Sequence, residues 1–162
     1  MTLSLRPYED ADWPDLLALW IETWSRARPD IDFTARTPWL AGLFKDSLAG
    51  GARIVVAADA AGPVGFVLFD PARSWLEQIA AHPRAFGTGA AKALLGQAKE
   101  ACPAGLRLDV NADNGRALAF YRREGFERVG KGRNPLSGLP TLTLEWRPPS
   151  SAGLKTRETP PS

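Results

Sequence analysis

The sequence predicts an α/β protein of the α+β type, in which a mixed, mostly antiparallel sheet of about seven strands is flanked by about four helices. Apolar residues recur with helical spacing in some segments and alternate as in strands in others. The resulting order is a strand, two helices, three strands, a helix, a strand, a helix and two strands. This order indicates a mixed sheet covered by helices.

The chain begins with a short strand and two helices. Residues 3–8 alternate as a strand. Residues 9–27 have helical periodicity, and Asp12 is the expected N-cap. Apolar residues between 39 and 48 indicate a second helix that ends at a glycine pair.

Three strands come next. Residues 53–59 and 63–70 are apolar runs separated by the turn sequence AAGP, which predicts an antiparallel hairpin. Residues 74–81 form the third strand, and a helix begins after Gly89. The expected buried face of this helix consists of Ala91, Leu94, Leu95, Ala98 and Cys102.

The last elements are a strand over residues 106–110, a helix capped by Asn114 and closed by Gly125, and two strands over residues 126–131 and 141–146. Residues 1–147 are expected to form one domain. The remaining residues, 148–162, are rich in proline, serine and charge and are expected to be disordered.

Composition narrows the class of protein. The formal net charge of +2 over 162 residues is too small to indicate a nucleic-acid or membrane partner. The one cysteine, Cys102, excludes an internal disulfide and a cysteine metal cage, and no metal is expected. No apolar run reaches the length of a membrane span, and no signal-like segment precedes the first strand, so we expect a cytoplasmic protein.

The stretch FGTGAA, residues 86–91, places two glycines directly before a helix. Glycine costs backbone entropy there, but its lack of a side chain lets an anion approach the free N–H groups of the first helical turn. The helix dipole adds about half a positive charge. The stretch therefore suggests a phosphate-binding loop, although a tight strand-to-helix turn explains it equally well. The spacing of a P-loop is absent.

Two blocks of sequence resemble the GNAT superfamily of N-acetyltransferases. The first block of that family has a proline after a strand and then [RQ]-G-x-G-x-[GA] opening a helix; the second reads N-x-x-A-x-x-[LF]-Y-x-x-x-G-F. Here Phe86 stands where the family usually has Arg or Gln. The matching residues are Pro83, Gly87, Gly89 and Ala91 in the first block, and Asn114, Ala117, Phe120, Tyr121, Gly125 and Phe126 in the second.

The resemblance implies acetyl-CoA as co-substrate. Its diphosphate would lie on the amides of residues 86–91, and its pantetheine arm would pair with the main chain of residues 79–81. The cofactor-binding residues implied are Ile79, Ala80, Ala81, Phe86, Gly87, Thr88, Gly89, Ala90, Ala91, Asn114 and Tyr121.

The resemblance also implies the catalytic groups. Tyr121 would donate a hydrogen bond to the coenzyme A sulfur, and a backbone N–H near Ala81 would stabilise the oxyanion. Asp109 and Glu77 are competing candidates for the base, and a water relay is the third option. His82 is expected to be a solvated turn residue, and Cys102 inert packing.

The family's acceptor region corresponds to the two N-terminal helices and the late loop GRNPLSGLP. For Asp30 and Asp32 in that region, capping of the second helix is favoured over binding a cationic amine. The expected partner is an amine acceptor, a small molecule or a protein amine, and a homodimer is the assembly considered. Two other functions stay open: a non-catalytic acyl-CoA-binding or interaction module, and a nucleotide-binding domain of another kind. The other residues named in that region are Trp24, Arg28, Phe33, Arg36 and Trp39.

Overall fold

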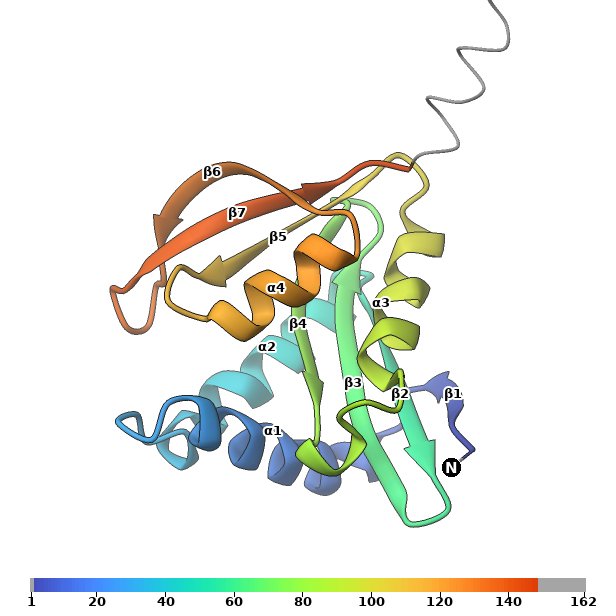
Figure 1. Cartoon of the computed structure of the whole chain (residues 1–162). Helices are drawn as coiled ribbons and strands as arrows, with labels where there is room; N and C mark the ends of the chain where they lie inside the picture. Colours follow the sequence, from blue (N-terminus) through green and yellow to red (C-terminus); the bar gives the residue numbers. More distant parts are fainter. Residues whose placement is uncertain (1, 149–162) are drawn as a thin grey trace, which may run out of the picture. The chain divides into compact units, whose positions relative to one another are not determined.

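The computed structural model describes residues 2–148 (Figure 1). Its contacts divide the chain into two compact units, Met1–Ala101 and Cys102–Ser162, which are described separately below. Apart from Pro148, the tail for which disorder is expected lies outside the described residues. Over the described part of the chain there are seven strands and four α helices, and the expected α/β class with mostly antiparallel pairing is confirmed.

The first unit contains a four-stranded antiparallel sheet in which neighbours along the chain are neighbours in space. Its strands are β1 (Ser4–Pro7), β2 (Arg53–Asp59), β3 (Gly62–Asp70) and β4 (Trp75–Ala81). The predicted hairpin is therefore confirmed. The β2–β3 pairing contains a bulge after Ala57 and the β3–β4 pairing one after Leu68, and at each bulge the register shifts by one residue.

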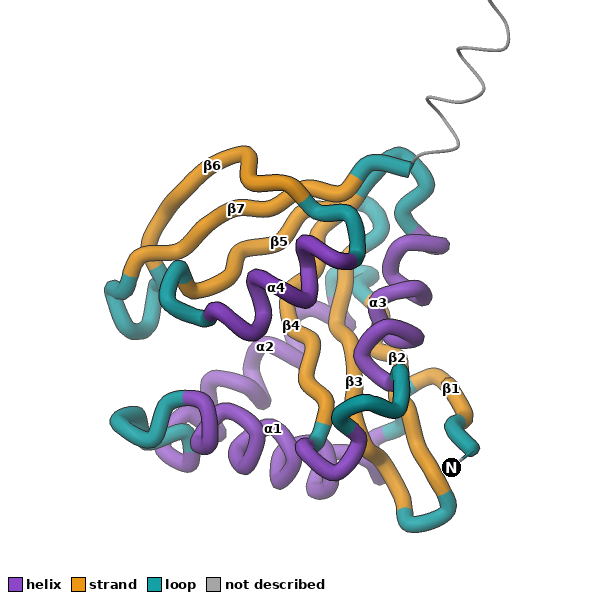
Figure 2. The backbone as a smooth tube through the Cα atoms, viewed as in Figure 1, coloured by secondary structure: helices purple, strands orange, loops and turns teal. Residues whose placement is uncertain are grey.

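Helices cover both faces of this sheet (Figures 1 and 2). On one face, α1 (Trp13–Ala27) and α2 (Thr37–Ala49) pack on Phe66 and Leu68 of β3. On the other face lies α3 (Ala90–Ala101), whose Leu94 approaches Gly65. Because consecutive residues of a strand point to opposite faces, the two groups of helices lie on opposite sides of the sheet. The core on the α1–α2 side consists of Leu16, Leu19, Trp20, Phe33, Leu40, Phe44, Ala52, Ile54, Val56, Phe66, Leu68 and Ala80.

The second unit contains a three-stranded antiparallel sheet and one helix. The strands lie in the order β5 (Leu106–Asn111), β7 (Pro140–Trp146) and β6 (Glu127–Arg133), so the last strand of the chain is central. On β5 the side chains alternate between buried and exposed, as the sequence pattern predicts. Helix α4 (Gly115–Arg123) is capped by Asn114, whose side-chain oxygen accepts the N–H of Ala117 at 3.1 Å.

Two local predictions need correction. Asp12 occupies the N-cap position of α1 as predicted, but its carboxylate makes no capping hydrogen bond to that helix. Instead it accepts hydrogen bonds from the Arg6 guanidinium at 2.6 and 2.7 Å and from the Glu9 N–H at 2.9 Å, because a short 3₁₀ turn leads directly into α1. On α3, Ala90 is buried and Ala91 only partly so, whereas the other predicted positions of the buried face are buried as expected: Leu94, Leu95, Ala98 and Cys102.

No helix in residues 2–148 is both long and apolar enough to cross a membrane.

Candidate active site

The loop between β4 and α3 has the backbone conformation that glycine permits. Gly87 and Gly89 have φ angles of +83° and +87°, in the left-handed region that other residues rarely adopt. A Cβ built at either position would have no heavy atom within 4 Å. Backbone conformation, and not lack of room for a side chain, is therefore what requires glycine here, and the loop surface beside both residues is open.

The N–H groups of this loop fall into two sets. Those of Phe86, Thr88 and Ala90 already donate to the carbonyls of Pro83 and Ala85 and to the Thr88 hydroxyl, at 3.1, 3.1 and 3.3 Å. Among the described residues, no acceptor is recorded for the N–H groups of Gly87, Gly89, Ala91 and Lys92, and the first helical bond of α3 is Ala93 N–H to Gly89 C=O at 2.9 Å. Four donors thus remain for a ligand at the positive end of the helix dipole.

His82, directly after β4, begins a short 3₁₀ turn as the sequence predicts, but its side chain is only 21% exposed and has a partner. Its Nδ1 accepts the Arg84 N–H at 3.1 Å, so the ring proton resides on Nε2, which donates to the Glu22 carboxylate of α1 at 2.6 Å. This hydrogen bond holds the pKa of Glu22 below its usual range. The sequence did not reveal this contact because the partner lies 60 residues away.

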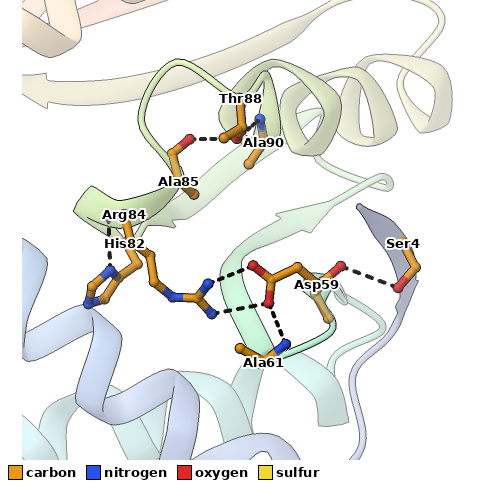
Figure 3. A network of polar contacts seen from close by, with 9 residues as sticks. Ser4, Asp59, Ala61, His82, Arg84, Ala85, Thr88 and Ala90 are labelled. Atoms are coloured by element: carbon orange, nitrogen blue, oxygen red, sulfur yellow. Dashed lines mark hydrogen bonds and ion pairs between the residues drawn. The ribbon is translucent and has the colours of Figure 1, made fainter. Parts of the chain in front are cut away.

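Arg84 is tied to another part of the first unit (Figure 3). Its guanidinium contacts both carboxylate oxygens of Asp59, at the end of β2, at 2.6 and 3.3 Å. Asp59 also accepts the Ala61 N–H at 2.8 Å, and the guanidinium beside it holds the pKa of this carboxyl below its usual range. Sequence reasoning missed Glu22, Asp59 and Arg84, because none of them carries a local signal for a long-range pair.

The strand β4 presents the residues expected to contact the pantetheine arm. Ile79, Ala80 and Ala81 pair with Val67, Phe66 and Gly65 of β3, and both alanines are buried. The carbonyl of Ala81 accepts a hydrogen bond from the Thr23 hydroxyl at 3.4 Å.

Glu77 lies at the bulge of β4. Leu68 pairs with Gln78 and Phe69 with Leu76, so Glu77 is the extra residue without a cross-strand partner. Its carboxylate is partly exposed, 3.5 Å from the Arg73 guanidinium.

In the second unit, Tyr121 on α4 is buried, with an exposed fraction of 6%. Its ring contacts those of Phe120 and Phe126, with centroids 5.3 and 5.4 Å away. Burial raises the pKa of the Tyr121 phenol, so the hydroxyl keeps its proton. Within residues 2–148 the Tyr121 hydroxyl has no hydrogen-bond acceptor from the protein. Its oxygen does not belong to the fully buried polar atoms without a partner, of which Thr141 Oγ1 is the example among the described residues.

The other site candidates of the second unit also have defined neighbours. Asp109 is exposed on β5 and accepts a hydrogen bond from the Thr143 hydroxyl of β7 at 2.7 Å. Asn114 uses its side-chain oxygen to cap α4. Cys102 is 1% exposed, in agreement with the expected packing role.

The residues of the α1–α2 connection are mostly engaged with one another. Asp32 accepts the Ala35 N–H at 3.2 Å, within the 3₁₀ turn before α2. The favoured capping role is therefore wrong, because the N-cap of α2 is Arg36, whose side chain makes no capping hydrogen bond. Asp30 instead pairs with Arg28, with N–O distances of 2.8 and 3.0 Å. Phe33 is buried, and the Arg36 guanidinium lies over its ring at 5.2 Å. Trp24 and Trp39 pack against the core.

Comparison with known proteins agrees with this geometry. The model of the acetyltransferase (GNAT) family matches residues 8–126. The chain therefore belongs to this family, the class of N-acetyltransferases that use acetyl-CoA to acetylate amines.

Individual relatives have low sequence identity to this chain. Peptidyl-lysine N-acetyltransferase YjaB of Salmonella typhimurium is 28% identical over 140 residues, which cover 86% of this chain and 94% of that protein. An uncharacterized protein of Mycobacterium leprae is 33% identical over 106 residues, or 60% of this chain but only 30% of that longer protein. The PaiA N-acetyltransferase of Thermoplasma acidophilum, solved with coenzyme A, has the same fold, with a TM-score of 0.74, 18% identity and coverage of 91% and 100%.

Proposed function

We propose that this protein transfers the acetyl group of acetyl-CoA to the side-chain amine of a lysine in a peptide or protein. Family membership supports the acetyl donor and an amine acceptor. Support for lysine comes from the similarity to the peptidyl-lysine N-acetyltransferase YjaB over nearly the whole of that protein. We place the protein in the cytoplasm, where acetyl-CoA and such acceptors would meet.

The observation that carries the proposal is the set of unused N–H groups at the start of α3. The N–H groups of Gly87, Gly89, Ala91 and Lys92 would donate to the diphosphate oxygens, and the glycines leave the approach open. The main chain of residues 79–81 would pair with the pantetheine arm. Acetyl-CoA supplies the activated thioester. A coenzyme A complex of a protein with the same fold supports this assignment.

Tyr121 would donate a hydrogen bond to the thioester sulfur. The raised pKa of its phenol means that the hydroxyl is a donor throughout the physiological range. Its ring contacts those of Phe120 and Phe126, which restrict the movement of the phenol. In such apolar surroundings a free thiolate is disfavoured, so a hydrogen bond to the departing sulfur has a larger effect than in water.

Asp109 would be the proton acceptor for the amine. A lysine amine with a pKa of ~10.4 is neutral in only about one molecule in a thousand at neutral pH, so deprotonation costs about 4 kcal/mol. The Asp109 carboxylate has a neutral hydroxyl as its recorded partner, whereas Glu77 faces the cation of Arg73. A carboxylate without a cationic partner attracts an ammonium group more strongly, which would bring the acceptor amine to Asp109.

The test is an assay of coenzyme A thiol release with a panel of lysine-containing peptides, and small amines and N-terminal amines for comparison. We expect Tyr121→Phe to lower kcat by about a hundredfold while the Kd of coenzyme A stays unchanged. Tyr8→Phe is the matched control, because Tyr8 is the other tyrosine of the chain and packs on Phe44 of the core. Coenzyme A binding without thiol release over the whole panel would instead support the non-catalytic module.

A further inference from the structure

The turn η3 (Pro83–Ala85), which precedes the glycine loop, is attached to two other elements of the first unit. On one side, the His82 ring donates to Glu22 of α1. On the other side, Arg84 makes its two contacts with Asp59 at the end of β2. Figure 3 shows the Arg84–Asp59 pair and the His82–Arg84 bond together with the turns that follow. The loop thus has fixed points on a helix and on a hairpin.

Local hydrogen bonds connect the turn that carries His82 and Arg84 to the part of the loop that has the free N–H groups. The His82 carbonyl accepts the Ala85 N–H at 2.8 Å, and the Ala85 carbonyl accepts the Thr88 N–H at 3.1 Å and the Thr88 hydroxyl at 2.5 Å. That hydroxyl accepts the Ala90 N–H at 3.3 Å. Gly87 and Gly89 lie on either side of Thr88, between residues that make these hydrogen bonds. A movement of His82 or Arg84 would therefore be passed on to the N–H groups beside the glycines.

The Asp59 carboxylate is held in place by the surrounding structure. Its side chain is only 8% exposed, and the Ala61 N–H fixes it within the β2–β3 turn. Arg84 is 37% exposed and reaches Asp59 with both terminal nitrogens. Two parallel contacts fix the direction of a guanidinium, which one contact from a lysine ammonium does not do.

We propose that Arg84 and His82 are positioning residues for acetyl-CoA: through Asp59 and Glu22 they hold the loop with its free N–H groups already arranged for the diphosphate. This rests on the proposed function. Binding a phosphate group to a loosely held loop would cost the entropy of ordering it, and fixing the loop beforehand avoids that cost. Neither residue needs to touch the ligand for this effect.

The charges allow this role to be separated from direct phosphate binding by Arg84. If Arg84 contacted a phosphate, removal of the negative charge of Asp59 would free the cation and strengthen binding of coenzyme A. If Arg84 positions the loop, Asp59→Asn breaks the anchor and weakens binding. The two roles therefore predict opposite signs for one substitution.

The experiment measures the Kd of coenzyme A by calorimetry for the wild type and for Arg84→Ala, Arg84→Lys, Asp59→Asn and His82→Ala. We expect each variant to bind about fivefold to twentyfold more weakly, with Arg84→Lys at the low end of that range. In the double variant of Arg84 and Asp59 the losses should not add, because both substitutions break the same contact. KM for S-acetylpantetheine, which lacks the diphosphate, should stay within about twofold of the wild type.

Arg6→Ala is the matched control. It breaks another two-contact Arg–Asp pair of the first unit, with Asp12, outside this loop. We expect a lower melting temperature but an unchanged Kd for coenzyme A.

The results decide whether Arg84 and His82 position the loop. Tighter binding by Asp59→Asn, unchanged binding by all four variants, or an equal loss for both donors would overturn the positioning role while leaving the proposed function intact. A wild-type protein that does not bind coenzyme A would overturn both.

Discussion

Gly65 on β3 and the carbonyl of Ala80 on β4 lie so close that a Cβ at Gly65 would be 2.7 Å from that oxygen. Real Cβ atoms do not approach a carbonyl this closely, so only glycine allows the two strands their present separation. Leu94 of α3 lies 3.1 Å from the same point and closes the space on that side. Gly65 therefore sets the position of the end of β4, the segment expected to pair with the pantetheine arm.

Gly65→Ala should accordingly displace β4. We expect a loss of about 1–3 kcal/mol in the free energy of unfolding, because the contact is with backbone, which cannot move aside as a side chain does. The Kd of coenzyme A should rise as well. Gly42→Ala is the control: a Cβ at Gly42 on α2 meets nothing within 4 Å, and alanine favours a helix, so stability should rise by about 0.5–1 kcal/mol. Denaturant titration measures both changes.

Gly89→Ala tests the conformation of the loop separately from its contacts. The φ of +87° makes alanine strained by about 1–2 kcal/mol even though the space around it is open. We expect a corresponding loss of stability and weaker coenzyme A binding, because the strain is relieved by turning the neighbouring N–H groups. Gly51→Ala has the same kind of strain, at a φ of +97°, in the turn after α2. It should lose similar stability and keep its affinity; a loss of affinity there too would show that the effect is not local.

Much of the fold follows from local patterns in the sequence. The helices and strands of both units were predictable because their apolar residues repeat with the period of one element, as on β5, where Leu106, Leu108 and Val110 are all buried. Gly87 and Gly89 were also identifiable, since a glycine before a helix marks an unusual backbone conformation. These features depend on residues close together in the chain.

The anchors of the loop depend on residues far apart. The Arg84–Asp59 pair spans 25 residues and the His82–Glu22 pair 60. No periodicity links such residues, so His82 reads as an ordinary turn residue until α1 lies beside it. The Arg6–Asp12 pair spans only six residues and was not foreseen for a different reason: Asp12 has the type and place of an N-cap, which hid its role as the partner of Arg6.

Asp12 makes stability depend on pH. The hydrogen bond from Arg6 lowers the pKa of Asp12, so the folded state binds a proton here less readily than the unfolded state. The stabilisation is present above the ordinary Asp pKa of about 4 and is lost as the pH falls below it. Asp12→Asn should cost about 1–2 kcal/mol at pH 7, and its difference from the wild type should shrink in acid.

Thermal unfolding between pH 7 and pH 2 measures that difference. Asp15→Asn, at an exposed position of α1, is the control and should change the free energy of unfolding by less than about 1 kcal/mol. A constant gap between Asp12→Asn and the wild type down to the lowest pH would show that packing, and not ionisation, causes the loss.

The two candidate carboxylates for the base can be separated by their effects on the rate. Asp109→Asn removes the proton acceptor but keeps an oxygen that can accept the Thr143 hydrogen bond. We expect kcat to fall by about a hundredfold or more and KM for acetyl-CoA to stay constant. Glu77→Gln keeps the length of the bulge residue and should change kcat less than about threefold, since Glu77 already faces Arg73.

The relative size of the two kcat losses assigns the base. A larger kcat loss in Glu77→Gln would assign the base to the bulge of β4, on the first unit. Equal and small losses in both variants would leave a water relay as the proton path, because removing either carboxylate alone would then not remove the acceptor.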